Sequence, residues 1–82
     1  MTTFQTARTE ILNWVAATLQ TTPEKVDLDK PLNELGIDSL DAVHLIATIE
    51  AVIRSELPED VIQRVSTLND IFEMMAQRLA AA

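Results

Sequence analysis

The amino-acid sequence predicts an all-α protein, a small four-helix bundle with three longer helices, one short helix and a long loop between the first and second helices. The 82 residues include one glycine and no tyrosine, while residues that favour helices, such as alanine, leucine and glutamate, are frequent. Apolar residues make up 48% of the chain and cysteine is absent. We therefore expect a single apolar core that forms without disulfides.

Apolar residues recur at helical spacing at the start of the chain and predict an amphipathic helix over about residues 3 to 20. The members of this stripe are Phe4, Ile11, Leu12, Val15 and Leu19. Trp14 lies at the edge of the stripe, where we expect it to pack rather than to bind a ligand.

The next segment, TTPEKVDLDKPLNELGID at residues 21–38, contains two prolines and the only glycine. A connection of this length is unusual in a compact domain and indicates a loop that has a function or is held against the bundle. Its apolar residues are the expected anchors, namely Val26, Leu28, Leu32 and Leu35.

A second helix is predicted from Leu40 to Arg54. Its core face consists of Ala42, Leu45, Ile46, Ile49 and Ile53. The opposite side carries Leu40, Val43, Ala47 and Ala51 together with His44 and Arg54, and it is flanked by Asp38, Asp41 and Glu50. An exposed apolar strip with an acidic border indicates a docking surface. The alternative is that the long loop covers the strip.

Proline suits a first helical turn, so Pro58 is expected to open a short helix in PEDVIQRV. The last helix begins after Thr67, which together with Asp70 predicts a capping box. Its core stripe is Leu68, Ile71, Phe72, Met75 and Leu79.

The charge of the chain indicates its class of partner. Thirteen acidic residues against six basic ones give a net charge of −7. This balance argues against nucleic acid and anionic membranes and favours basic protein partners. No targeting segment or membrane-spanning apolar run is present. We therefore expect a soluble, cytoplasmic monomer that works as a free-standing single domain over residues 1–82.

Ser39 lies where the long loop becomes the second helix. Asp38 is the expected helix cap, with Asp41 three residues later, and a serine in the first turn is unremarkable by itself. A hydroxyl at this position also lies beside unpaired backbone N–H groups at the positive end of the helix, which favours an attached phosphate. Asp38 and Asp41 would repel such a phosphate and are better explained as groups that attract a basic enzyme.

The stretch LGIDSLDAVHLIATIE resembles the attachment motif of acyl carrier proteins, in which the serine of Asp-Ser-Leu receives 4′-phosphopantetheine. The resemblance covers nearly the whole chain, including LNELGIDSL and LPEDVIQRVSTL. It implies that Ser39 carries covalent 4′-phosphopantetheine taken from coenzyme A, with Asp38 and Leu40 completing the motif. It also implies a partner-recognition face of Leu40, Asp41, Val43, Ala47 and Glu50.

The resemblance implies a carrier without catalysis of its own. Acyl groups would be held as thioesters on the arm and delivered to partner enzymes of fatty acid, polyketide or specialised lipid biosynthesis. The implied partners are a phosphopantetheinyl transferase and enzymes of the ketosynthase and acyltransferase type. The second helix is less acidic than in many carriers, with His44 at a position that is often acidic. This departure supports the hypothesis of a specialised carrier, with drift at surface positions as the alternative.

Other carriers and an unmodified protein remain as alternatives. A peptidyl carrier tends to have glycine and histidine before the serine, so GID favours an acyl cargo, and a D-alanyl carrier stays open. The alternative from a different class is an acidic helical interaction module, or adaptor, in which Ser39 carries nothing.

Hydrolysis and metal binding are disfavoured. Ser39 and His44 are about 140° apart on the helix, so His44 cannot readily act as a base for the serine, and a glycine-rich nucleophile elbow is missing. DLDKPLNELGID places Pro31 and Leu32 at the fifth and sixth positions of a would-be calcium loop, where the EF-hand requires a ligand and a glycine. No metal site is expected.

Overall fold

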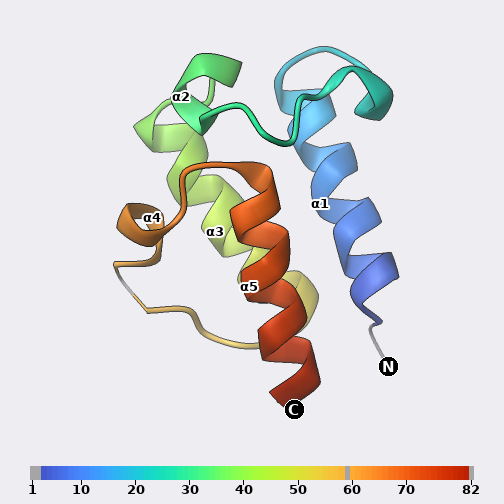
Figure 1. The fold of residues 1–82 in the computed structure, drawn as a ribbon, viewed down its shortest axis with the longest axis vertical. Coiled ribbons are helices and arrows are strands. Elements are labelled where there is room, and N and C mark those ends of the chain that lie inside the picture. The colour runs from blue at the N-terminus through green and yellow to red at the C-terminus, as the bar shows by residue number, and fades with distance from the viewer. Residues whose placement is uncertain (1–2, 59, 82) are drawn as a thin grey trace.

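The computed structural model describes residues 3–58 and 60–81 of the chain. In this part the longer elements are α1 (Phe4–Thr18), α3 (Ser39–Ile53) and α5 (Leu68–Ala81), and there is no strand. Helix α1 runs opposite to α3 and α5 and packs against both, while α3 also packs against α5 (Figure 1). The predicted all-α bundle is therefore confirmed.

The shorter elements differ in part from the prediction. They are the 3₁₀ helix η1 (Pro23–Lys25) and the helices α2 (Leu32–Leu35) and α4 (Val61–Arg64). Helix α4 is the predicted short helix, whereas η1 and α2 lie within the loop that the sequence left without structure. The predicted start at Pro58 is wrong, because the Pro58 carbonyl accepts a hydrogen bond from the Val61 N–H (3.1 Å) in a turn that precedes α4.

The core lies between the three longer helices. Its most completely buried side chains are Ile11, Val15, Leu45, Ile49, Leu68, Ile71 and Met75, all of them predicted core residues. Trp14 is half-buried and packs against this core, as expected. Ile37 is also buried, which the sequence did not predict because a single apolar residue between Gly36 and Asp38 shows no periodicity.

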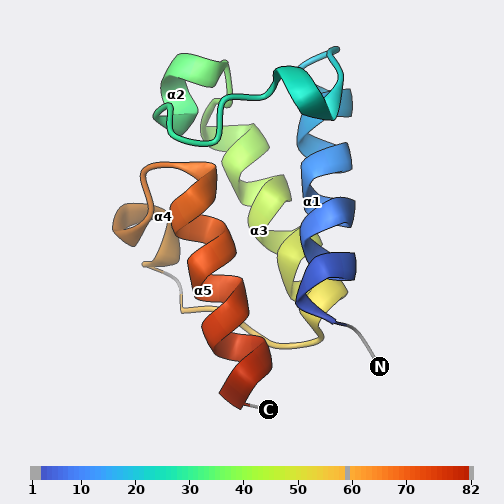
Figure 2. The ribbon, with the colours of Figure 1, turned by 45° about the vertical axis from the view of Figure 1, so that its right-hand side comes forward.

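The long loop is held against the bundle, as predicted. Val26 is buried, and the other three expected anchors, Leu28, Leu32 and Leu35, are half-buried against the core. Backbone hydrogen bonds tie the loop to the start of α5: Leu32 N–H donates to the Ser66 carbonyl (2.9 Å) and Asn69 N–H donates to the Leu28 carbonyl (3.1 Å). Figure 2 shows this loop crossing the end of the bundle at which α3 begins.

The predicted capping box at the start of α5 is confirmed. Asp70 N–H donates to the Thr67 hydroxyl (3.2 Å), and the Asp70 carboxylate accepts from the N–H groups of Ser66 (2.9 Å) and Thr67 (3.2 Å). Among the described residues, no helix is both long enough and apolar enough to cross a membrane.

The capping box makes part of the stability depend on pH. The hydrogen bond from the Ser66 backbone, followed by that from Thr67, lowers the pKa of Asp70 below its ordinary value. Ionised Asp70 therefore stabilises the fold above the unfolded-state pKa of about 3.9, and this contribution is lost as the pH falls through the folded-state pKa. We expect Asp70→Asn to lower the melting temperature at about pH 6 and to lower it less at about pH 3, because part of the contribution is lost below the unfolded-state pKa. Thermal unfolding followed by circular dichroism measures both; an equal difference at the two pH values would contradict this account.

Candidate functional site

Ser39 is the first residue of α3 and is exposed. Asp38 precedes it as the helix cap, and its carboxylate accepts a hydrogen bond from the Asp41 N–H (2.8 Å). The expected cap is thus present, and the motif residues Asp38, Ser39 and Leu40 lie together at the exposed start of the helix.

A tight turn before Asp38 positions this serine. Helix α2 ends at Leu35 and is capped by Gly36, whose φ of 103° lies in the left-handed region. Its N–H donates to the Asn33 carbonyl (3.3 Å), and the Ile37 N–H donates to the Leu32 carbonyl (3.1 Å). A Cβ at position 36 would meet only Leu19 Cδ2 at 3.6 Å, an ordinary contact. Backbone conformation rather than lack of space therefore requires glycine here.

Gly36→Ala should lower the free energy of unfolding by about 1 to 2 kcal/mol, because an L-residue in this conformation is strained. Gln20 provides a matched control, since it also follows a helix and has a φ of 57°. Gln20→Gly should therefore raise the free energy of unfolding by about 0.5 to 1 kcal/mol. Urea denaturation tests both substitutions, and a change of the same sign in the two variants would disprove the conformational explanation.

The first turn of α3 leaves polar groups available around the serine. Asp41 N–H is used by the Asp38 cap and Ala42 N–H by the Asp38 carbonyl (2.9 Å). The N–H groups of Ser39 and Leu40, and the Ser39 hydroxyl, form no hydrogen bond with the described residues. These N–H groups lie at the positive end of the helix dipole and can stabilise a negative charge on the serine.

An open hollow of about 400 Å³ lies beside Ser39. It is lined by residues 31–33, 37–39 and 42 and by Val65 and Ser66 from the link between α4 and α5. The Leu32–Ser66 backbone hydrogen bond described above joins two of its walls. Sequence reasoning missed Val65 and Ser66, because they approach Ser39 only through tertiary contacts between distant segments.

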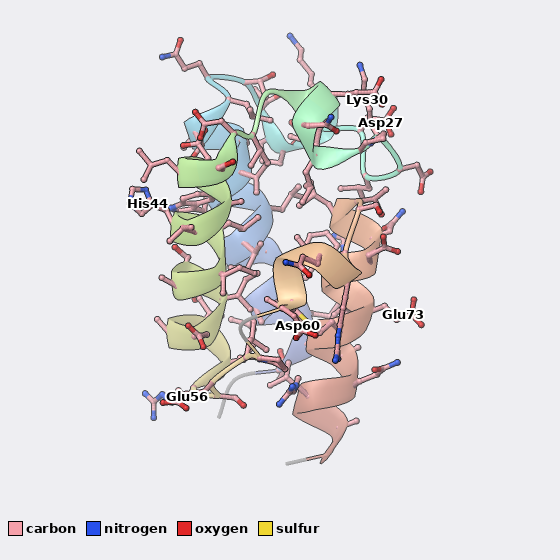
Figure 3. The ribbon with its side chains drawn as sticks, turned by 90° about the vertical axis from the view of Figure 1, so that its left-hand side faces the viewer. Asp27, Lys30, His44, Glu56, Asp60 and Glu73 are labelled. Carbon is pink, nitrogen blue, oxygen red and sulfur yellow. The ribbon has the colours of Figure 1, made fainter. Side chains whose placement is uncertain are left out.

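The outward face of α3 is exposed rather than covered by the loop. Leu40 and Val43 are the large apolar side chains most open to solvent in the described chain, at 64% and 61% exposure. Ala47 is exposed on the same face, and Figure 3 shows His44 pointing from it away from the bundle. The alternative in which the loop buries this strip is therefore wrong.

The two acidic residues within α3 lie at the margins of this face. Asp41 and Glu50 are both half-buried. The Glu50 carboxylate accepts a short hydrogen bond from the Leu57 N–H (2.7 Å), which fastens the segment that leaves α3. No sequence signal marks this interaction, since it joins residues seven positions apart across the end of a helix.

The arrangement does not form a hydrolytic centre. His44 lies on the outward face, Ser39 opens the helix, and the Ser39 hydroxyl has no hydrogen bond to His44. What remains is an accessible serine hydroxyl, a stabilised helix start and a neighbouring apolar face. These features suit a protein that receives a covalent group and presents a docking face.

Comparison with known proteins agrees with that class. The family model described as "Phosphopantetheine attachment site" matches residues 9–75. An acyl carrier protein of Amoebophilus asiaticus (strain 5a2) is 35% identical over 72 residues, covering 87% of this chain and 90% of the relative. Acyl carrier proteins of Guillardia theta (39% over 49 residues, 60% of each chain) and Phytoplasma mali (strain AT; 34% over 71 residues, 85% of this chain and 84% of the relative) are also similar.

The chain belongs to the acyl carrier protein family. It contains a phosphopantetheine attachment domain and acts as an acyl carrier rather than as an enzyme.

Proposed function

We propose that Ser39 is the residue to which 4′-phosphopantetheine is attached. The observation that carries the proposal is the position of its hydroxyl, which is exposed, has no hydrogen bond to the described residues and opens α3 next to unused backbone N–H groups. A phosphopantetheinyl transferase would join the serine oxygen to the phosphopantetheinyl group of coenzyme A. The hydroxyl proton is lost in this step, and adenosine 3′,5′-bisphosphate leaves.

The residues around Ser39 suit this group. The N–H groups of Ser39 and Leu40 can hold a phosphodiester oxygen, since helix starts favour bound anions. The Asp38 carboxylate already accepts from the Asp41 N–H, so it faces the helix cap. The adjoining hollow gives the first part of the arm space beside the serine. When bound, the group supplies a flexible arm with a terminal thiol for thioester formation.

The outward face of α3 would bring partner enzymes to the arm. We assign recognition to Leu40, Asp41, Val43, Ala47 and Glu50. The exposed pair Leu40 and Val43 supports an apolar contact. The Glu50 carboxylate also accepts the hydrogen bond from the Leu57 N–H. The partners would include the transferase and ketosynthase- or acyltransferase-type enzymes. We place this single-domain, monomeric carrier in the cytoplasm.

Intact-protein mass spectrometry after incubation with coenzyme A and a promiscuous phosphopantetheinyl transferase tests the proposal. We expect the mass to increase by one phosphopantetheinyl group, and fragmentation should locate that group on the peptide that contains Ser39. The chain has two further serines, Ser55 and Ser66, to which the label could otherwise map. Labelling at either of them would disprove the assignment. Absence of labelling, while a known carrier is labelled in parallel, would favour an unmodified adaptor or a carrier that requires a dedicated transferase.

A further inference from the structure

The fully exposed positions along the outward face of α3 carry no carboxylate, although the chain as a whole has a net charge of −7. The exposed side chains along the helix after Ser39 are apolar apart from one imidazole; they are Leu40, Val43, His44, Ala47 and Ala51. The net charge of the chain, together with Asp38 and Asp41 near Ser39, favoured a basic partner surface. The face that adjoins Ser39 does not show the acidity on which that expectation depends.

The carboxylates nearest this face lie at its edges or are used within the fold. Asp38 is exposed just before Ser39, where its carboxylate accepts the Asp41 N–H. Asp41 is half-buried at one margin. Glu50 is half-buried at the other, where it accepts the Leu57 N–H. A basic residue of a partner that settled over Val43 would therefore meet mainly Leu40 and Ala47, about one helical turn to either side, and would lose water with carboxylates only at the margins, which is unfavourable.

The far end of the face carries one basic and two acidic residues. Arg54, the exposed residue that ends α3, lines a hollow together with Glu50 and Glu56. Many of the exposed acidic residues lie on other elements, for example Glu10 on α1 and Glu73 on α5. Figure 3 shows Glu73 on the opposite side of the bundle from His44. Among the described residues, Asp38 and Glu56 are the fully exposed acidic residues at the two ends of this face, and the other exposed ones lie on other parts of the chain.

We propose that α3 docks on an apolar patch of its partner enzyme that lacks a cluster of lysine and arginine residues. This inference rests on the proposed function, because the face is continuous with Ser39 and docking there would bring the arm to the partner. Burial of Leu40 and Val43 provides the attraction. Charge contributes little, so docking depends only weakly on salt, and enzymes with a strongly basic docking patch are poor partners.

The test uses the loaded carrier and two forms of one ketosynthase. The first form has a docking patch rich in lysine and arginine, and in the second those residues are changed to glutamine. Loading of each carrier is verified by intact mass before kcat/KM for acyl transfer is measured at about 50 and 300 mM salt. A carrier that does not load contradicts the proposed function, whereas a loaded carrier that docks through charge contradicts only this inference.

We expect kcat/KM of the wild-type carrier to change by less than about twofold with salt and to be no lower with the neutralised ketosynthase. The double variant His44→Glu/Ala51→Glu makes the face acidic. It should raise kcat/KM with the basic ketosynthase roughly fivefold at low salt, and high salt should remove the gain. The double variant Leu40→Ala/Val43→Ala should lower kcat/KM roughly fivefold with both forms.

The control is Gln63→Glu/Gln77→Glu, which adds the same two negative charges at exposed positions on α4 and α5. This control variant should not raise kcat/KM with the basic ketosynthase, because its two substituted residues lie away from the face. A gain equal to that of the α3 variant would show that net charge rather than the face controls docking. A steep loss of wild-type kcat/KM with salt, or with the neutralised ketosynthase, would also overturn the proposal.

Discussion

Substituting alanine for Ser39 is expected to abolish attachment of phosphopantetheine while leaving the fold intact. The hydroxyl oxygen is the atom that would form the phosphodiester, so its removal leaves nothing to modify. The side chain is exposed and has no hydrogen bond to the described residues, and alanine is at least as favourable as serine in a helix. The melting temperature should therefore change by no more than about 4 °C.

Ser66→Ala is the matched control for this experiment. Ser66 is also an exposed serine and lines the same hollow, but it does not open a helix. Intact mass should show complete loss of labelling in Ser39→Ala and full labelling in Ser66→Ala. If Ser39→Ala remains labelled, the attachment residue has been assigned wrongly. If it unfolds, the serine has a structural function that its exposed position does not explain.

Leu45→Ala should cause the largest loss of stability among the substitutions considered. Leu45 is fully buried on the core face of α3, and removing a buried leucine side chain costs about 2 to 5 kcal/mol through lost transfer energy and the resulting cavity. A domain of this size has a total stability of only about 5 to 15 kcal/mol. The midpoint of urea unfolding should therefore fall sharply, with the m-value unchanged.

Leu40→Ala makes the same chemical change on the same helix. Because Leu40 is 64% exposed, the free energy of unfolding should change by no more than about 0.5 kcal/mol. A similar loss at positions 40 and 45 would mean that the outward face is buried in solution. Should Leu45→Ala fail to fold, Ile49→Val provides a milder test on the same face, with an expected loss of about 1 kcal/mol.

The three longer helices could be predicted from local patterns in the sequence, with the start of α3 within one residue of its position in the structure. Apolar spacing identified Ile11, Leu45 and Ile71 as core residues because helical periodicity is a local property that each segment expresses without its neighbours. Caps are local as well, so Asp38 and the Thr67–Asp70 pair could be recognised from residues three positions apart. Ser39 became a candidate through its motif and its place in the first turn.

Contacts between distant segments could not be predicted in this way. The hollow beside Ser39 requires Val65 and Ser66 to approach α2, and Glu50 binds Leu57 across the end of α3. The burial of Ile37 and the exposure of Leu40 and Val43 depend likewise on where the long loop settles. These features depend on contacts between residues that are far apart in the sequence. No local spacing pattern predicts such contacts, so they can be identified only in the folded structure.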